Sequence, residues 1–428
     1  MTKPLKIAIA GLGTVGGGVA SLLLTRGAEL AQRAGRPLEL VGVSARDKAK
    51  KRAADVSKVA WEADATALVN SHADVIVELI GGEEGAARSL VTSTLRAKKH
   101  VVTANKALLA YHGTELASLA EENDVALKFE AAAAGGIPIV KALRESLIAY
   151  GIDAVRGILN GTCNYILTQM EATGRSFEDV LSEAQKLGYA EADPTLDVGG
   201  GDTAHKLAVL SALAFGAAPN LKNIQTVGIT HITTDDIKFA HEFGHRIKLL
   251  GIARRIGDRI DQRVEPAMVK LGTPLADVDG AFNAVVAHAR EAGPFTFEGR
   301  GAGEAPTTSA VIADLVDIAR GMFGAPFGRP AKSLITDGGR PGPRQGAFYL
   351  RFEVRDAPGV LAEIARRLAE AEVSIESMIQ RGRAPGGAVA IVMITHDCLE
   401  TALSSALKAI AASDKVLASP CMIPIEAG

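Results

Sequence analysis

The sequence has little cysteine, few aromatic residues, no excess of either charge and no long apolar run. Its 428 residues include three cysteines and one tryptophan, and the formal net charge at pH 7 is −2. Three widely spaced cysteines exclude a disulfide framework and a cysteine-rich zinc site, and they favour a reducing compartment. The near-neutral charge provides no broad basic surface, so neither a nucleic acid nor a membrane is expected as a partner.

No segment predicts a membrane span or a secretory leader. The best internal apolar run, 207–218, falls well short of the roughly 20 residues that cross a bilayer. The N-terminal apolar stretch superficially resembles a leader, but five glycines between Gly11 and Gly18 would break its helix. We therefore expect a cytoplasmic protein, and the length predicts two or three domains.

The first 150 residues alternate short apolar runs with helical stretches. The runs are 6–11, 38–44, 75–81, 99–105 and 125–131. Continuous apolar strands separated by helices are typical of a parallel sheet that is covered on both faces. We predict an α/β fold with a Rossmann-type doubly wound parallel sheet in domain 1–150.

Residues 151–301 have a different texture and predict an α+β domain with a mixed sheet. Its expected strands are 154–160, 224–232, 263–271, 283–289 and 294–299, with helices over 178–188 and 202–216. A helix over 307–321 follows, and we expect residues 302–320 to complete the first domain. The Gly- and Pro-rich stretch 321–346 is predicted to be a linker.

The C-terminal residues 347–428 predict a compact βαββαβ unit. We expect strands over 347–354, 373–380, 387–396 and 415–423, and helices over 359–371 and 399–410. Val360, Ile364 and Leu368 fall on one face of the first helix. This order of elements is the ferredoxin-like arrangement.

A glycine fingerprint lies between the first apolar run and the helix that follows it. It reads Gly11-Leu-Gly13-Thr14-Val15-Gly16. In this context the glycines permit a tight turn, close approach of a pyrophosphate and close helix packing, so we predict dinucleotide binding. Arg46 follows the second strand, where it can accept a 2′-phosphate, while the adjacent Asp47 leaves NAD open.

A carboxylate and a lysine share the apolar face of one predicted helix. At about 100° per residue, Lys206 lies in the middle of the arc formed by Leu207, Val209, Leu210 and Leu213, and Asp202 lies on the same side. A buried charge persists only if it is paired, neutralised or used. A lysine ammonium there is a plausible general acid for an alkoxide formed by hydride transfer.

Three further residues carry candidate chemistry. Lys106 follows a predicted strand of the first domain, where ligands of doubly wound sheets collect. Glu191, together with Asp202, can hold a substrate ammonium. Glu130 and the carbonyls of the glycine-containing turn after it can ligate a hard cation.

Together these segments resemble homoserine dehydrogenase over residues 5–320. The resemblance lies in GLGTVG, TANK, EAAAAGGIP, NGTCNYIL, GYAEADPTLDVGGGDTAHKLAVL and GRGAGEAPTTSAV. It implies reversible conversion of L-homoserine to L-aspartate 4-semialdehyde with NADP or NAD, in the route to threonine, methionine and isoleucine. Reduction is the physiological direction in that family, and we expect the monofunctional form, in which no kinase domain precedes the nucleotide domain.

The resemblance also implies roles for individual residues. Lys206, Lys106 and Asp202 are the expected catalytic residues, with Lys206 as proton donor or acceptor. Glu191 and Asp202 are expected to bind the substrate, whereas Lys106 and Gly303 would contact the cofactor. A sodium ion is implied at Glu130 with the carbonyls of three residues: Ala133, Gly135 and Ile137.

The C-terminal unit resembles an ACT domain, a module that commonly binds amino acids. Asp356 and Gly359 lie in the matching Asp-Ala-Pro-Gly turn and are the expected regulatory residues, with threonine as effector. Because substrate domains and ACT units of this family both pair, a homodimer or homotetramer is expected.

Two other functions stay open on the sequence alone. Cys163 lies in a turn before a helix, a setting that can activate a thiol nucleophile for aldehyde dehydrogenase-like chemistry. Alternatively, the ACT-like module makes the chain a non-catalytic amino-acid sensor. The complete glycine fingerprint and the inward-facing Lys206 favour a dehydrogenase.

Overall fold

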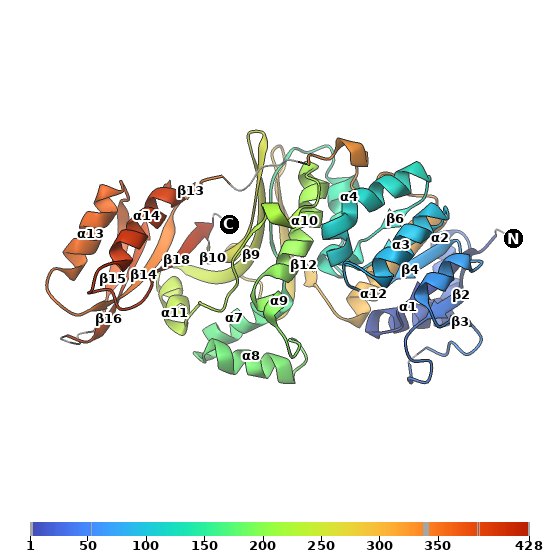
Figure 1. The fold of residues 1–428 in the computed structure, drawn as a ribbon, viewed down its shortest axis with the longest axis horizontal. Coiled ribbons are helices and arrows are strands. Elements are labelled where there is room, and N and C mark those ends of the chain that lie inside the picture. Colours follow the sequence, from blue (N-terminus) through green and yellow to red (C-terminus); the bar gives the residue numbers. More distant parts are fainter. Residues whose placement is uncertain (1–2, 53, 337–341, 383, 385, 427–428) are drawn as a thin grey trace.

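The computed structural model describes residues 3–52, 54–336, 342–382, 384 and 386–426. The N-terminal sheet and the C-terminal unit lie at opposite ends of the long axis, with the central region between them (Figure 1). Among the described residues, no helix combines the length and apolar character that crossing a bilayer requires.

The N-terminal sheet has six parallel strands in the order β3-β2-β1-β4-β5-β6. The strands are β1 (Leu5–Ala10), β2 (Leu38–Ser44), β3 (Ala60–Glu62), β4 (Val75–Glu78), β5 (His100–Thr103) and β6 (Leu127–Lys128). The predicted doubly wound sheet is confirmed. The direction of strand addition reverses between β1 and β4, which is where ligands of such sheets bind.

Helices cover both faces of this sheet. They are α1 (Thr14–Thr25), α2 (Gly27–Ala34), η1 (Ala65–Asn70), α3 (Ala86–Arg96), α4 (Lys106–Glu122) and the distant α12 (Glu304–Ala319). The helix α12 packs against α1, where a Cβ on Gly18 would lie 2.6 Å from Thr308 Oγ1. Residues that follow the central sheet in sequence therefore return to the N-terminal one.

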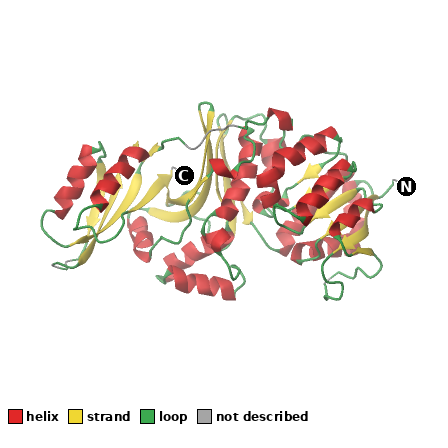
Figure 2. Ribbon diagram, in the orientation of Figure 1, coloured by secondary structure: helices red, strands yellow, loops and turns green. Residues whose placement is uncertain are grey.

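The central strands continue into the C-terminal sheet without a break (Figure 2). The combined order is β12-β11-β7-β9-β10-β18-β14-β16-β15, with β8 beside β10. The central strands are β7 (Ile152–Ile158), β8 (Gln225–Thr226), β9 (His245–Ile256), β10 (Arg259–Lys270), β11 (Phe282–Ala289) and β12 (Gly293–Arg300). The mixed sheet expected from the sequence is present.

The remaining helices and turns lie mostly around the central strands, except η4, which packs on α4. They are α5 (Ala131–Ala134), α6 (Ile139–Lys141), η2 (Ala142–Ser146), α7 (Gly161–Thr173), α8 (Phe177–Lys186), α9 (Thr195–Val198), α10 (Gly201–Phe215), η3 (Leu221–Asn223), α11 (Thr234–Glu242) and η4 (Ala331–Ser333).

Three strands of the N-terminal and central parts differ from what the sequence predicts. The 12-residue strand β9 was not predicted, because its arginines and lysine hide the apolar pattern. The strand expected over 224–232 is extended only at Gln225–Thr226, since the chain then turns and Ile229 donates its N–H to Val198 O at 2.9 Å. The strand expected over 125–131 ends at Lys128, because Glu130 already has helical dihedrals.

The C-terminal unit has the predicted βαββαβ order. It consists of β14 (Phe348–Arg355), α13 (Val360–Glu370), β15 (Ile375–Gln380), β16 (Ala388–Thr395), α14 (Glu400–Ala411) and β18 (Cys421–Glu426), with a small β13 (Gln345–Gly346) and β17 (Cys398–Leu399) pair. The last strand begins at Cys421 rather than at residue 415.

Strand β18 belongs to both parts of the combined sheet. It pairs with β14 at Phe348↔Pro424 and with β10 at Met268↔Ile425. The buried Glu426 carboxylate accepts hydrogen bonds from Arg156 on β7 at 3.3 Å and from Arg254 on β9 at 2.7 Å. The C-terminal unit is thus joined to the central strands by a shared strand and by ion pairs.

The first part of the segment expected as a linker packs on the N-terminal part, whereas Arg344 pairs with Glu265 on β10 and Gln345–Gly346 form β13. Phe327 is buried, with its ring centroid 5.3 Å from that of Phe129. The backbone N–H of Ala331 donates to the Glu121 carboxylate on α4 at 2.9 Å. Residues 337–341 of the predicted linker lie outside the described residues.

Asp236 is the main polar contact between α11 and the C-terminal unit. Its fully buried carboxylate accepts hydrogen bonds from Arg351 Nε at 2.7 Å and from the Tyr349 hydroxyl at 3.1 Å. It also accepts the Thr233 N–H at 2.9 Å, which completes a capping box at the start of α11. One carboxylate therefore fixes both the helix start and strand β14.

We predict that Asp236→Ala lowers the free energy of unfolding by about 2–4 kcal/mol, because it leaves the partly buried Arg351 guanidinium and the buried Tyr349 hydroxyl without their partner. Denaturant unfolding followed by circular dichroism measures the change. The exposed neighbour Asp235 supplies the matched control, Asp235→Ala, for which we expect less than about 0.5 kcal/mol. Equal effects of the two variants would contradict this assignment.

Candidate active site

The glycine fingerprint forms the turn between β1 and α1. Gly11 has φ +97°, and a Cβ there would lie 2.5 Å from Leu79 O. A Cβ on Gly16 would lie 1.8 Å from Gly11 O, so only glycine permits this packing. At Gly13 a Cβ would meet nothing within 4 Å, which leaves open space beside the start of α1.

A cavity of about 940 Å³ lies beside this turn, at the carboxyl ends of β1, β2 and β4. Gly11, Gly13, Ser44 and Gly81 are among the residues that line it. Thr14 and Val15 begin α1, so the backbone N–H groups of the first helical turn are available to a phosphate. The cavity and the open space at Gly13 fit a dinucleotide.

Cationic side chains surround the end of this cavity beyond β2. Arg46, Lys50 and Arg52 line it. Asp47 lines it too, but its carboxylate accepts the backbone N–H groups of Ala49 at 2.8 Å and Lys50 at 3.2 Å. The Asp47 carboxylate is therefore already hydrogen-bonded to the backbone of its own loop.

The predicted lysine–carboxylate pair lies between the two parts of the molecule. Lys206 is 9% exposed, and its Nζ lies 2.8 Å from Asp202 Oδ2 and 2.6 Å from Leu159 O. The other carboxylate oxygen, Asp202 Oδ1, lies 2.9 Å from Lys106 Nζ at the start of α4. The structure thus brings together all three residues predicted to be catalytic.

Asn160, which the sequence analysis did not assign to the site, completes this cluster. It precedes α7 as the N-cap, where its Oδ1 accepts the Cys163 N–H. Its Nδ2 donates to Asp202 at 2.9 Å and to Asp197 at 2.8 Å. The sequence signal for this role was an asparagine after a predicted strand, but its partner Asp202 lies 42 positions away in the sequence.

Two ammonium groups determine the electrostatics of the cluster. Burial alone would raise the pKa of Asp202, yet Lys206 and Lys106 hold it well below its usual range. Burial opposes the charge on Lys106, but the Asp202 carboxylate outweighs it and raises the pKa of that ammonium. Asp202 therefore remains ionised between two cations, and these three side chains together carry a net positive charge, which an ionised Asp197 would offset.

Asp197 is the one carboxyl of this cluster whose environment favours protonation. Burial, reinforced by the charge of Asp202, raises its pKa, although the hydrogen bond from Asn160 opposes the shift. Burial has the opposite effect on the pKa of His205, which it lowers, so burial favours the neutral form of this ring too.

Two further predicted residues, Glu191 and Gly303, are not among the hydrogen-bonded groups of this cluster. Glu191 is exposed and makes no ion pair in the described part of the chain, but its charge contributes to the raised pKa of Lys106. Gly303 has φ +109° and directly precedes α12.

In the turn after Glu130, where a cation is expected, several oxygens already accept hydrogen bonds from the backbone. The Glu130 carboxylate accepts the N–H groups of Val140 and Lys141, both at 2.9 Å, and Ile137 O accepts the Ile139 N–H at 2.8 Å. Burial, then the neighbouring Glu130, raises the pKa of Asp314 to about 7. Within the described residues, no group of three or more His, Cys, Asp or Glu side chains is arranged to hold a metal.

Cys163 is not placed as a nucleophile. It is fully buried and donates its thiol hydrogen to Asp197 O at 3.3 Å. Burial raises the pKa of the thiol well above its usual value, and the nearby Asp197 acts in the same direction. A reactive thiolate needs the opposite environment, so the aldehyde dehydrogenase-like alternative has no support here.

Comparisons with known proteins match nearly the whole chain to one family. The homoserine dehydrogenase profile matches residues 138–316, and its NAD-binding domain profile matches residues 11–130. The homoserine dehydrogenase of Neisseria gonorrhoeae is 43% identical, with 99% of each chain covered. The chain belongs to the homoserine dehydrogenase family. It is therefore an NAD(P)-dependent oxidoreductase that acts on homoserine, and the sensor alternative is not supported.

Solved structures confirm the fold. A homoserine dehydrogenase from Thiobacillus denitrificans, 41% identical over 99% of each chain, superimposes with a TM-score of 0.92. A hyperthermophilic archaeal homoserine dehydrogenase solved in complex with NADPH is 24% identical and has a TM-score of 0.65. The match covers 76% of this chain and 100% of the archaeal chain. An ACT domain profile matches residues 348–414, so the C-terminal unit is an ACT domain.

We predict that Lys206→Ala lowers kcat by about 10²–10⁴-fold, because a proton donor or acceptor is removed, while coenzyme affinity stays within about twofold. Lys206→Arg keeps the charge but cannot release a proton, so we expect it to be nearly as inactive. Steady-state kinetics and coenzyme titration measure the two effects.

The exposed Lys186 on α8 provides the control, and Lys186→Ala should retain normal kcat. Parallel losses of kcat and coenzyme affinity in Lys206→Ala would assign Lys206 a structural role instead.

Proposed function

We propose that the Lys106–Asp202–Lys206 cluster performs the proton chemistry of reversible homoserine oxidation, with reduction of aspartate 4-semialdehyde as the physiological direction. The observation that carries this proposal is the buried Asp202 carboxylate, which holds one ammonium on each oxygen beside the nucleotide cavity. Two hydrogen bonds of Lys206, to Asp202 and Leu159, leave one N–H for a substrate oxygen.

In this proposal Lys206 transfers the proton in both directions of the reaction. The nicotinamide, when bound, supplies or receives the hydride. In the reductive direction the Lys206 ammonium donates a proton to the substrate oxygen as negative charge develops there, and becomes a neutral amine. In the oxidative direction the neutral amine accepts the hydroxyl proton and becomes the ammonium. The net positive charge of the cluster stabilises the developing alkoxide.

The remaining site residues have supporting roles in this proposal. Asp202 and Glu191 bind the substrate ammonium, which requires Glu191 to approach from its exposed loop. Lys106 lies on the nucleotide side of Asp202, where it contacts substrate and coenzyme together. Gly303 precedes α12 and lies on the nicotinamide side.

The activity itself is tested by adding L-homoserine and NADP and following absorbance of the reduced nicotinamide. We expect a signal that depends on both additions. No signal at high enzyme concentration would return the sensor function to consideration.

We propose that the coenzyme is NADP rather than NAD. Three cations line the cavity beyond β2, while Asp47, the acidic residue suited to a ribose 2′-hydroxyl, is hydrogen-bonded within its own loop. Arg46 has no side-chain partner in the described part of the chain, so its guanidinium is available to a 2′-phosphate. The archaeal relative solved with NADPH adds support.

We predict that Arg46→Ala raises the KM for NADP about tenfold or more and leaves the KM for NAD within about twofold, because the lost hydrogen bonds are to the 2′-phosphate. The single tryptophan, Trp61, stacks under Arg52 at 5.3 Å and provides a fluorescence titration of the same binding.

Lys51 lies on the same loop but does not line the cavity, so Lys51→Ala is the matched control. If Arg46→Ala weakened NAD and NADP equally, the arginine would not read the 2′-phosphate.

We also propose that a sodium ion binds at the turn after Glu130. Because both Glu130 oxygens already accept backbone N–H groups, the ion would be bound by the carbonyls of Ala133, Gly135 and Ile137 together with the remaining lone pairs of Glu130. The nearby Asp314, whose carboxyl is fully buried, would gain a compensating positive charge.

We propose that threonine is the effector and that the ACT domain binds it near Asp356 and Gly359. Gly359 has φ +88° and precedes α13, so its turn presents backbone N–H groups to a carboxylate. The Asp356 carboxylate accepts the Ala384 N–H at 2.8 Å through one oxygen, which leaves the other for an ammonium.

We predict that threonine inhibits the full chain and that Asp356→Ala raises the half-inhibitory concentration about tenfold or more, with the exposed Asp414→Ala as control. Initial rates over a threonine series measure this. Unchanged inhibition in Asp356→Ala would place the effector elsewhere.

Deletion of 347–428 should also relieve inhibition, but it removes β18 from β10 and strips Glu426 from Arg156 and Arg254. The single substitution is therefore the sharper experiment.

Assembly, domain limits and cellular location are proposals of the same kind. We propose a cytoplasmic homodimer or homotetramer, with domain limits at 1–150, 151–301 and 347–428. The profile matches over 11–130, 138–316 and 348–414 support this division.

A further inference from the structure

Asn283 lies on β11 between two segments of the candidate active site, and none of the roles proposed above uses it. Its side chain is buried, with 1% of the residue exposed. On one side the amide packs on Gly161 at the start of α7, where a Cβ would lie 3.4 Å from Asn283 Oδ1. On the other side it packs on Gly301 after β12, where a Cβ would lie 2.0 Å from Asn283 Nδ2. Two glycines therefore make room for one buried amide.

The Asn283 amide has no hydrogen-bond partner among the described residues. Both Oδ1 and Nδ2 are buried, and neither is paired. Most buried polar side chains are hydrogen-bonded, because an unpaired one has lost the hydrogen bonds that water would supply. A leucine of similar size would fill the same space without that loss, so the presence of an amide at this position needs an explanation.

The two segments that contact Asn283 carry different parts of the proposed chemistry. The first includes Leu159, just before α7, whose carbonyl accepts Lys206 Nζ at 2.6 Å. The second includes Gly303, which lies in the same turn as Gly301 and is proposed for the nicotinamide side. Asn283 thus lies between the segment that holds the proposed proton donor and the segment proposed to face the coenzyme.

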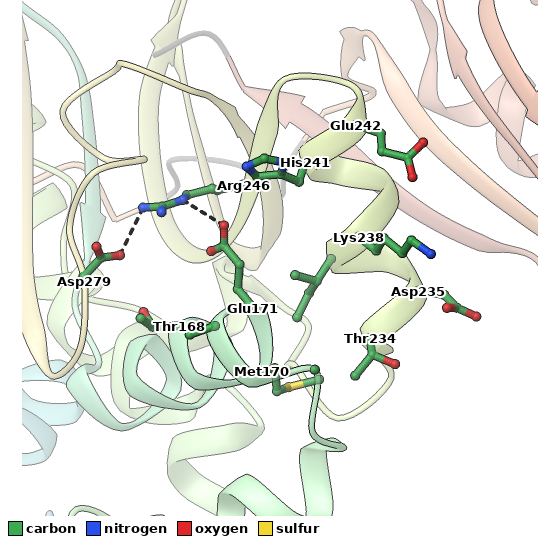
Figure 3. A pocket seen from close by; sticks show the side chains of 13 residues that line it. Thr168, Met170, Glu171, Thr234, Asp235, Lys238, His241, Glu242, Arg246 and Asp279 are labelled. Carbon is green, nitrogen blue, oxygen red and sulfur yellow. Dashed lines mark hydrogen bonds and ion pairs between the residues drawn. The ribbon is translucent and has the colours of Figure 1, made fainter.

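The first segment is fixed relative to the start of β11. Arg246 joins Glu171 on α7 to Asp279, which precedes β11, and both contacts are 3.0 Å long. Figure 3 shows the guanidinium between these two carboxylates. The Asn164 amide, also on α7, donates to Gly280 O at 2.9 Å. The start of β11, and with it the backbone of Asn283, is therefore held against α7.

The second segment, 301–303, has fewer contacts. Ala302 and Gly303 are exposed, and Gly303 has φ +109°. The backbone N–H and C=O groups of Gly301 and Ala302 make no hydrogen bond to any described residue. Unpaired donors and acceptors of this turn therefore lie beside the unpaired amide of Asn283, and a small shift of the turn would pair them.

We propose that Asn283 is a positioning residue that fixes the 301–303 turn when the coenzyme is bound. Its Oδ1 would accept an N–H of the turn and its Nδ2 would donate to a carbonyl of the turn. Because the turn is proposed to face the nicotinamide, bound coenzyme favours the paired arrangement. The turn would then hold the nicotinamide in place relative to Lys206. The inference rests on the proposed function through the place of Gly303.

The test is Asn283→Leu, which keeps the approximate size of the side chain and removes its polar atoms. Because the amide is unpaired in the free protein, the denaturant midpoint of the free protein should stay the same or rise. The Kd of the preferred coenzyme, NADP or NAD, should rise about threefold or more, and kcat should fall about tenfold or more. Circular dichroism, Trp61 fluorescence and steady-state kinetics measure the three quantities.

Asn123→Leu is the matched control. The Asn123 amide donates to Leu119 O at 2.9 Å, at the opposite end of α4 from Lys106. Coenzyme Kd and kcat should therefore stay within about twofold in this variant. Should Asn283→Leu fail to fold, Asn283→Ala takes its place, because it removes the amide without adding a larger group, and the same rise in Kd is expected.

The proposal is overturned if Asn283→Leu lowers the midpoint of the free protein, because the amide would then serve the fold, for example through a buried water. An unchanged Kd or an unchanged kcat in Asn283→Leu overturns it as well. If the unmodified chain does not turn over homoserine, the proposed function fails instead. The midpoint and the coenzyme Kd need no turnover and still decide the role of Asn283.

Discussion

The structure depends on one buried carboxylate shared by two ammonium groups. Asp202 is 5% exposed and bridges Lys206 on its own helix to Lys106 on the nucleotide-binding side. A carboxylate at that depth is stable only because both oxygens are paired. The same contact holds Lys206, the proposed proton donor, against the start of α4, so the stability of the interface and the proposed chemistry have a common origin.

Much of this site could be predicted from the sequence, because its main residues lie close to one another along the chain. Asp202 and Lys206 are one helical turn apart, and the apolar residues around them show that both face inward. The glycine fingerprint is equally local, since each glycine acts within one turn and the start of α1. Resemblance to the family then adds the substrate, which these patterns alone do not specify.

Residues whose roles depend on distant partners were not predictable in the same way. Asn160 reaches Asp202 only after β7 and α10 pack together, 42 positions apart. Strand β9 carries basic residues whose charges are balanced far along the chain, as Arg254 is by Glu426. Asp236 looks like an ordinary helix-capping residue until Arg351, 115 positions later, is placed on it. Such contacts appear only with the tertiary structure.

The shared strand β18 has a consequence for folding. Residues Cys421–Glu426 lie far beyond β10 in the sequence, yet they pair with it in the middle of the combined sheet. Until β18 pairs, part of one edge of β10 is exposed with unpaired backbone groups, which invite aggregation. A substitution that slows the folding of the ACT domain would therefore also leave the central sheet incomplete.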